Sequence, residues 1–346
     1  MDAREALGVV ASGGTLSRAQ AESAMTSVMA GEATAAQLGA LLAALAVRGE
    51  TVDEIAGFAA AMRAAAVKVS LGTTEAVDIV GTGGSRADPF NISTVASVVT
   101  AATGVPVAKH GNRAASGRCG SADVLEALGV KIDLGPAGIA QCVADAGIAF
   151  MFAARFHPAM RHAGPVRREM GIRTVFNILG PLANPAGVRR MVVGVASEAI
   201  GEKIARVLGE LGADHVLVVH GADGLDEISP TGPTRTWELR GGAVRAGTID
   251  PAELGLTPCA LADIASGDPA ANAAAARSIL AGEQGPRRDA VLLNAGAALR
   301  IAGAVASMRD GMVAAARAVD SGAAADRLAR FVATSQRLGV AEGAPA

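Results

Sequence analysis

Residues 76–94 of the chain read AVDIVGTGGSRADPFNIST. An apolar, β-branched run enters three glycines within four positions, and a helical pattern opens at Asn91, Ser93 and Thr94. This strand, turn and helix predict one unit of a parallel sheet, because parallel strands need a crossover connection that is usually a helix. Glycines bring backbone N–H groups close to a ligand, and free N–H groups at a helix start favour a phosphate. The stretch is therefore suited to an anion.

The alternation of strand and helix continues on the C-terminal side of this stretch. Short apolar runs rich in β-branched residues predict strands at 76–80, 105–110, 130–134, 148–152, 191–196 and 215–220. Helical patterns separate the first of these strands, at 93–103, 121–128 and 137–146. Such alternation forms βαβ units, so we expect an α/β fold with a mostly parallel central sheet. A hairpin is predicted at 234–244, and further helices at 289–299, 308–318 and 323–338.

The first seventy residues have a different pattern, which is helical throughout. Capping boxes pair a Ser or Thr with a Gln or Glu three residues later, and three of them occur at 17–20, 34–37 and 51–54. Gly31 and Gly49 lie where helices would end. The sequence therefore predicts a small helical domain at 1–70 and a large α/β domain formed by 73–154 and 188–340.

A basic segment at 155–187 separates the two parts of the predicted large domain. It contains four prolines and is expected to leave the sheet, pack in part on the helical domain and return, which would leave a cleft between the domains. Arg167 could reach into that cleft, where a guanidinium would hold a carboxylate in a bidentate manner. For most of the basic residues here, a solvated helix face is the simpler interpretation. His157 and His162 have no ligands at zinc spacing.

Composition excludes several classes of function. With 51% hydrophobic and 18% charged residues among 346, the chain is typical of a globular protein. A net charge of −2, with one Trp and no Tyr, argues against a nucleic-acid-binding surface. We expect no signal peptide and no membrane span, because the N-terminus and the apolar runs do not fit either. Three widely spaced cysteines form no disulfide or metal pattern and indicate a reducing cytoplasm.

A second polar motif, KHGNRAASGRCGS at 109–121, also follows a predicted strand. It brings Lys109, Arg113 and Arg118 together with hydroxyls and glycines at the carboxyl end of that strand. Ligands of open α/β sheets bind at this edge, so two such loops indicate a ligand with more than one phosphate group. A structural turn at 81–84 and a solvated basic loop at 109–121 are the alternatives.

A third motif, DGLDEIS at 223–229, follows the strand predicted at 215–220. Asp226 and Glu227 would face the phosphate loops from that strand end. Such a carboxylate pair suits Mg²⁺, which prefers oxygen ligands and keeps waters and substrate phosphates in its shell. For an Asp–Glu pair taken alone, a solvated acidic turn is the better interpretation.

Taken together, these motifs resemble those of the anthranilate phosphoribosyltransferases. The resemblance covers nearly the whole chain and rests on GTGG (81–84), FNIST (90–94), KHGNR (109–113), GSADVLEALG (120–129), RFHPAMRH (155–162), VRREMGIRTVFNILGPLANP (166–185) and DGLDEIS (223–229). It implies a small helical domain beside an α/β domain, and a homodimer formed through the small domain. It also implies Mg²⁺-dependent transfer of phosphoribose from 5-phosphoribosyl 1-pyrophosphate to the amine of anthranilate, in tryptophan biosynthesis.

The resemblance also implies roles for individual residues. Catalytic roles fall on Lys109, Asn112 and Arg167. The phosphoribosyl pyrophosphate site would include Gly81, Gly84, Ser85, Pro89, Asn91, Ile92, Ser93, Thr94, Lys109, His110, Gly111, Asn112, Arg113, Ala114, Ala115, Ser116, Gly117 and Ser121. The anthranilate site would include Gly81, His110, Asn112 and Arg167. Mg²⁺ would be held by Ser93, Asp226 and Glu227.

The chain departs from the usual residues of the family at three positions. Ser85 stands where most members have an acid, Pro89 replaces a common Thr, and Gly117 replaces a Ser. Two other functions stay open. One is a pyrimidine-nucleoside phosphorylase-like enzyme of the same two-domain architecture, against which the carboxylate motif argues. The other is a diverged paralogue that binds a nucleotide or nucleic acid without this catalysis, against which the retained Asn112 and Arg167 argue.

Overall fold

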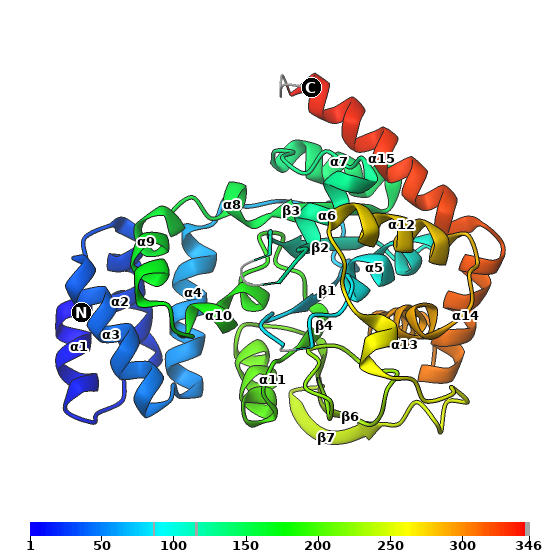
Figure 1. Cartoon of the computed structure of the whole chain (residues 1–346). Coiled ribbons are helices and arrows are strands. Elements are labelled where there is room, and N and C mark those ends of the chain that lie inside the picture. The colour runs from blue at the N-terminus through cyan, green and yellow to red at the C-terminus, as the bar shows by residue number, and fades with distance from the viewer. Residues whose placement is uncertain (86, 115–116, 343–346) are drawn as a thin grey trace.

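The computed structural model of the chain describes residues 1–85, 87–114 and 117–342 (Figure 1). Ala115 and Ser116, both predicted to bind phosphoribosyl pyrophosphate, lie outside the described residues. The chain forms a small N-terminal helical domain beside a larger α/β domain, as the sequence predicts (Figure 1).

The small domain begins with helices that pack against one another. These are α1 (Ala3–Ala11), α2 (Arg18–Ala30), α3 (Ala35–Arg48) and α4 (Val52–Ala65). The predicted capping boxes are confirmed at Ser17, Thr34 and Thr51, where each hydroxyl accepts the N–H of the residue three positions later. A further box between Asp2 and Glu5 opens α1. Local hydrogen-bonding patterns in the sequence therefore predict these helix starts correctly.

The large domain is organised around a sheet whose described residues form seven strands in the order β3-β2-β1-β4-β5-β6-β7. The strands are β1 (Val77–Gly81), β2 (Val107–Gly111), β3 (Ile148–Phe152), β4 (Arg190–Gly194), β5 (His215–Gly221), β6 (Thr234–Arg240) and β7 (Ala243–Ile249). Neighbours from β3 to β5 run parallel, whereas β5, β6 and β7 pair antiparallel and include the predicted hairpin. The chain proceeds outward from β1 on one side and from β4 on the other. The boundary between β1 and β4 is therefore a topological switch point, where ligands of such sheets bind.

Helices cover the sheet and connect its strands. They are α5 (Ile92–Ala102), α6 (Ser121–Leu128), α7 (Pro136–Ala146), α11 (Gly201–Glu210), α12 (Pro269–Leu280), α13 (Pro286–Ala302), α14 (Met308–Asp320) and α15 (Ala323–Ala341), with the 3₁₀ turns η2 (Glu198–Ile200) and η3 (Leu261–Ile264). α5 packs on β1, α13 packs along α5 and β4, and α11 packs on β5 and β6. The sequence prediction lacks α11 and α12. α12 is alanine-rich, so its apolar stripe is too weak to be recognised by periodicity.

The strand predicted at 130–134 is wrong. Val130, Ile132 and Leu134 are buried and alternate with less buried residues, so the segment has the periodicity of a strand. Its backbone, however, connects α6 to α7, and the Lys131 N–H donates to Ser335 Oγ on α15 at 3.0 Å. A helix side chain thus takes the place of a neighbouring strand, which the local pattern cannot reveal.

The basic segment between β3 and β4 extends to the small domain. It contains α8 (Ala153–Phe156), α9 (Met160–Met170), α10 (Phe176–Leu179) and the 3₁₀ turn η1 (Gly180–Leu182). α9 packs against α2 and α3 at the left of the molecule (Figure 1). The contact is close, because a Cβ at Gly31 would lie 2.6 Å from the His162 ring. After α9, helix α10 packs against α4, and the chain then returns to the sheet at β4.

Arg63 joins α4 directly to the large domain. Its guanidinium donates from Nε to Leu182 O at 2.6 Å and from Nη1 to Leu211 O at 3.0 Å. Nearby, Lys203 Nζ donates to Glu50 O. One apolar cluster also extends from the bundle into the sheet. Within the described residues, no helix has both the length and the apolar character needed to cross a membrane.

Gly57 lies where α4 crosses α2, and its environment generates a stability prediction. A Cβ at Gly57 would lie 2.3 Å from Arg18 O and 2.8 Å from Ala21 Cβ. We expect Gly57→Ala to lower the free energy of unfolding by about 1–3 kcal/mol, because the two helices must separate. Gly8→Ala is the matched control, since a Cβ at that helical position would meet no atom of the described residues within 4 Å beyond its own helix backbone and chain neighbours. Denaturant unfolding measures both variants, and equal stability of the two would contradict the described helix crossing.

Candidate active site

The loops that carry the predicted motifs leave the sheet at its carboxyl edge, on both sides of the switch point. The glycine loop, residues 81–85, follows β1, and the second loop, residues 111–114 and 117–121, follows β2. The acidic loop, residues 223–229, follows β5, which is separated from β1 by β4. The acidic loop must therefore cross the end of β4 to reach the other two.

Two glycines allow this crossing. A Cβ at Gly194, the last residue of β4, would lie 1.7 Å from Asp226 O. A Cβ at Gly81 would lie 2.6 Å from Asp226 Oδ2. Because neither residue has a side chain, Asp226 reaches the glycine loop and accepts the Gly83 N–H on Oδ2 at 2.8 Å. The carboxylate predicted to hold Mg²⁺ is thus brought against the loop predicted to hold the donor.

Glu227, Ser93 and Lys109 meet beside this contact. The Ser93 N–H donates to Glu227 Oε1 at 3.3 Å, and Lys109 Nζ donates to Ser93 Oγ at 3.3 Å. Lys109 Nζ also donates to Ile79 O in β1. The structure therefore brings together predicted residues from three strand ends, which are far apart in sequence.

The charges in this cluster fit a divalent cation. Burial, and then the neighbouring Asp226, raise the pKa of Glu227 above its usual range. A bound cation would relieve that crowding of carboxylates. Within the described part of the chain, no three His, Cys, Asp or Glu side chains gather as a complete metal site. Two carboxylates and the Ser93 hydroxyl fit Mg²⁺, which commonly completes its shell with substrate phosphate oxygens and water.

Asp78, for which no site role was predicted, lies buried near Lys109 and contacts His110. Its buried carboxylate accepts the His110 N–H at 3.3 Å and an Asn184 Nδ2–H at 2.8 Å. Burial raises its pKa to about 6, while Lys109 acts in the opposite direction. Burial also lowers the pKa of Lys109, and Asp78 and Glu227 oppose that shift. A charged residue within a strand flanked by apolar residues was the available signal, since such a residue is rarely buried without partners.

His110 lies beside His157, which comes from the basic segment. Their ring centroids are 5.1 Å apart, and His110 Nδ1 lies 3.2 Å from Gly180 O. Burial lowers the pKa of His110 to about 3 and that of His157 to about 4. Both imidazoles are therefore neutral at neutral pH. Neither Nε2 atom has a hydrogen-bond partner among the described residues.

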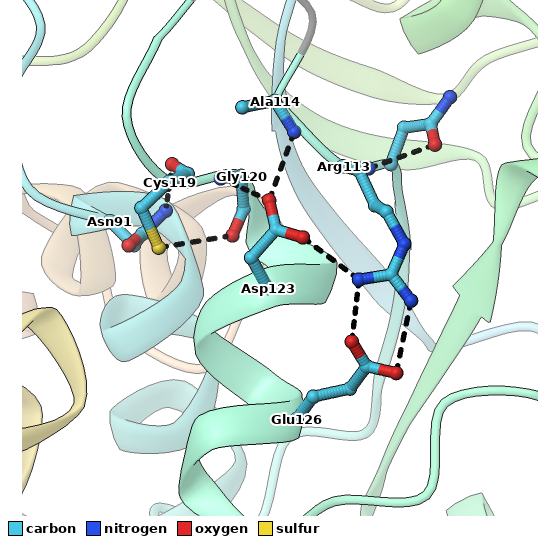
Figure 2. Close-up of polar contacts among 8 residues, drawn as sticks. Asn91, Arg113, Ala114, Cys119, Gly120, Asp123 and Glu126 are labelled. Atoms are coloured by element: carbon cyan, nitrogen blue, oxygen red, sulfur yellow. Dashed lines mark hydrogen bonds and ion pairs between the residues drawn. The ribbon is translucent and has the colours of Figure 1, made fainter. Parts of the chain in front are cut away.

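The second loop is fastened by carboxylates of α6 (Figure 2). The Ala114 and Gly120 N–H groups both donate to Asp123 Oδ2, at 3.1 and 2.8 Å. The Arg113 guanidinium donates to Asp123 Oδ1 at 2.9 Å and to Glu126 Oε1 at 3.0 Å. The side chain of Arg113, predicted to bind phosphoribosyl pyrophosphate, is thus paired with the protein's own acids.

The start of α5 differs from the expectation of free N–H groups. The N–H groups of Ile92, Ser93 and Thr94 donate to Phe90 O, Glu227 Oε1 and Asn91 O, respectively. The Ile92 and Thr94 side chains are buried, and the Thr94 Oγ1 atom has no partner among the described residues. The acidic loop therefore occupies the helix start that the sequence assigned to a phosphate.

The other predicted residues lie along the two loops. Asn112 and Gly117 are exposed, Ser85 is partly exposed, and Pro89 forms a bridge with Ala265. Gly111 and Ser121 lie side by side, because a Cβ at Gly111 would be 3.3 Å from Ser121 Cβ. These positions leave Asn112 and Gly117 accessible at the edge of the site.

Two arginines of the basic segment lie in different environments. The partly buried Arg167 guanidinium lies over the Phe176 ring, 5.2 Å from its centroid, and burial lowers its pKa. Arg173 is exposed, and it donates from Nη1 to Gly83 O and Gly84 O at 3.4 Å each. A Cβ at Gly84 would lie 1.9 Å from that nitrogen. Arg173 therefore contacts the glycine loop, although no site role was predicted for it.

Comparison with known proteins agrees with this arrangement. The model of the glycosyl transferase family a/b domain matches residues 73–325, and that of its helical bundle domain matches residues 4–66. The anthranilate phosphoribosyltransferase of Methylobacterium nodulans is 53% identical over 329 residues, which cover 95% of this chain and 97% of the relative. That of Beijerinckia indica is 54% identical over 328 residues, which cover 95% and 96%.

Solved structures show the same similarity. Anthranilate phosphoribosyltransferase from Thermus thermophilus matches with a TM-score of 0.91 and 44% identity, covering 97% of this chain and 100% of that one. The Saccharomyces cerevisiae enzyme, in complex with phosphoribosyl pyrophosphate and Mg, matches with a TM-score of 0.88 and 26% identity, covering 96% and 97%. The resemblance inferred from the motifs is confirmed, and the chain belongs to the anthranilate phosphoribosyltransferase family.

Proposed function

We propose that this chain transfers the phosphoribosyl group of 5-phosphoribosyl 1-pyrophosphate to the amine of anthranilate and releases pyrophosphate. One observation carries the proposal: Asp226 and Glu227 cross β4 and contact the glycine loop and Ser93. A carboxylate pair placed against two phosphate-type loops suits a donor with a pyrophosphate group and Mg²⁺. Solved relatives from S. cerevisiae in complex with phosphoribosyl pyrophosphate and Mg, and with 4-fluoroanthranilate, support both substrate classes.

In the proposed site, the glycine loop and the second loop hold the phosphoribosyl pyrophosphate. Asp226, Glu227 and the Ser93 hydroxyl would hold Mg²⁺. When bound, that ion supplies positive charge against the pyrophosphate as it departs. Lys109 adds a cation from β2, where Asp78 and Glu227 favour its charged form. The protein's contribution to the bond cleavage is thus electrostatic stabilisation of the leaving group.

The acceptor side of the proposed site needs orientation more than a strong base, because the anthranilate amine is itself a nucleophile. Arg167 would hold the anthranilate carboxylate, and its position over Phe176 limits the directions its guanidinium can take. Neutral His110 and His157 add no positive charge where the ribose becomes cationic. Asn112, exposed on the second loop, would contact the acceptor. Holding both reactants in line can contribute several kcal/mol, roughly 7 or more in favourable cases.

The finer assignments belong to the same proposal. We place the small domain at 1–70 with part of 155–187, and the large domain at 73–154 and 188–340. We also propose that the protein forms a homodimer through the small domain. A cytoplasmic location is proposed as well, and the three unpaired cysteines support it.

The direct test is turnover of the purified protein. Anthranilate, phosphoribosyl pyrophosphate and Mg²⁺ are mixed with it, and anthranilate fluorescence is followed as the product forms. We expect fluorescence to fall in an enzyme- and Mg²⁺-dependent manner. Phosphorolysis of a pyrimidine nucleoside without this turnover would favour the phosphorylase-like function, and nucleotide binding without either reaction would favour a non-catalytic paralogue.

Arg167→Ala tests the acceptor assignment. We expect the KM for anthranilate to rise roughly 10- to 100-fold, the range expected when a hydrogen-bonded charge pair is lost. The KM for phosphoribosyl pyrophosphate should change little. The neighbouring, exposed Arg168→Ala is the matched control and should resemble the unmodified protein. Equal increases in both KM values for Arg167→Ala would show that the acceptor role is misassigned.

Asp226→Ala combined with Glu227→Ala tests the metal assignment. We expect Mg²⁺-dependent turnover to fall at least about 100-fold, because the leaving group loses its main charge stabilisation. Calorimetry should also show that Mg²⁺ no longer strengthens binding of phosphoribosyl pyrophosphate. Asp250→Ala with Glu253→Ala removes the same charge beyond β7 and is the control. Retained activity, or retained Mg²⁺-dependent binding, would reject this pair as the metal ligands.

A further inference from the structure

Asn272 lies on α12, outside every motif that pointed to the function. Its side chain is 3% exposed and makes three hydrogen bonds. Its Oδ1 accepts the Gly267 N–H at 2.8 Å, and its Nδ2 donates to Ser266 Oγ and to Asn91 Oδ1, both at 2.9 Å. The carboxamide is thus fully used, and one of its partners is a residue of the proposed donor site.

These hydrogen bonds fix the orientation of the Asn272 carboxamide and, through it, that of the Asn91 carboxamide. The Gly267 N–H is a donor, so it must face the oxygen of Asn272. The nitrogen of Asn272 then faces Asn91, which must present its own oxygen. The nitrogen of Asn91 consequently faces Cys119 O, a group that can only accept, at 3.0 Å (Figure 2). Each link agrees with the next, so neither amide can flip without placing like groups together.

This orientation decides what Asn91 offers to a ligand. Asn91 is the N-cap residue of α5, but its side chain makes no capping bond there. It instead connects the start of α5 to Cys119 in the second loop. Among the described residues, Cys119 O is the acceptor recorded for Nδ2, which leaves the second N–H of that amide for an anionic oxygen. A flipped Asn91 would present its carbonyl oxygen to the same anion, which is repulsive.

We propose that Asn272 is a positioning residue for the donor site, which holds the carboxamide of Asn91 so that its N–H, and not its oxygen, faces phosphoribosyl pyrophosphate. The inference rests on the proposed function, because it takes that donor as the ligand. It adds α12 to the elements that build the site. It also explains why a buried amide is retained in an otherwise alanine-rich helix.

A simpler role for Asn272 would be to stabilise residues 266 and 267 alone. Those residues also contact the site, since the Ser266 N–H donates to Asp88 O and Arg118 Nη1 donates to Ser266 O. Both contacts use the backbone of Ser266. Ser266→Ala therefore removes one hydrogen bond of Asn272 while leaving these contacts and Asn91 in place, and it is the matched control.

The experiment measures the Kd for phosphoribosyl pyrophosphate with Mg²⁺ by calorimetry, together with the KM of each substrate and the thermal unfolding temperature. Asn272→Ala should raise the Kd for this donor roughly five- to tenfold, the effect of one neutral hydrogen bond. Asn272→Asp keeps the size and the acceptor for Gly267 N–H but loses the donors, so it should weaken donor binding at least as much. The KM for anthranilate should hardly change in either variant, and Ser266→Ala should bind the donor as the unmodified protein does.

A double-mutant cycle shows whether Asn272 acts through Asn91. We expect Asn272→Ala to have no further effect on the donor Kd once Asn91→Ala is present. Full additivity of the two changes, or a Ser266→Ala effect equal to that of Asn272→Ala, would overturn the proposal. An unchanged Kd in a folded Asn272→Asp variant would do the same. Because binding is measured apart from turnover, loss of the proposed function in the unmodified protein would appear separately as donor binding without anthranilate consumption.

Discussion

The site depends on one hydrogen bond, from the Gly83 N–H to the Asp226 carboxylate, formed across the end of a strand that belongs to neither residue. Gly194 ends that strand and makes the crossing sterically possible. The parallel sheet supplies only strand ends at one edge. The missing side chains at positions 81 and 194 convert that edge into a compact group of donors, acceptors and charges.

Around this contact, burial sets the charge of each group. Lys109 is enclosed beside Asp78 and Glu227, so its cation is compensated within the protein before any ligand arrives. Burial, in contrast, lowers the pKa of the two imidazoles and keeps them neutral. The site therefore sets the Lys109 cation of β2 among carboxylates and keeps the His110–His157 side uncharged.

The sequence predicts those features that local chemistry determines. The capping boxes at Ser17, Thr34 and Thr51 are hydrogen-bonding units within four residues, and the motif order identifies the family. Features that depend on distant partners were missed. The segment 130–134 alternates like a strand but has a helix as its neighbour, and the buried Asp78 is paired with Asn184 of a distant segment. Asn272 could not be found at all, because an isolated Asn in an alanine-rich helix has no local signature.

The contacts of Arg63 bear on which substitutions its neighbours tolerate. Both acceptors of its guanidinium, Leu182 O and Leu211 O, are main-chain carbonyls, which every amino acid provides. Substitutions at 182 and 211 therefore preserve the acceptors as long as the backbone path is kept. At this joint the sequence requirement falls on the arginine, whereas Leu182 and Leu211 contribute only their backbone oxygens.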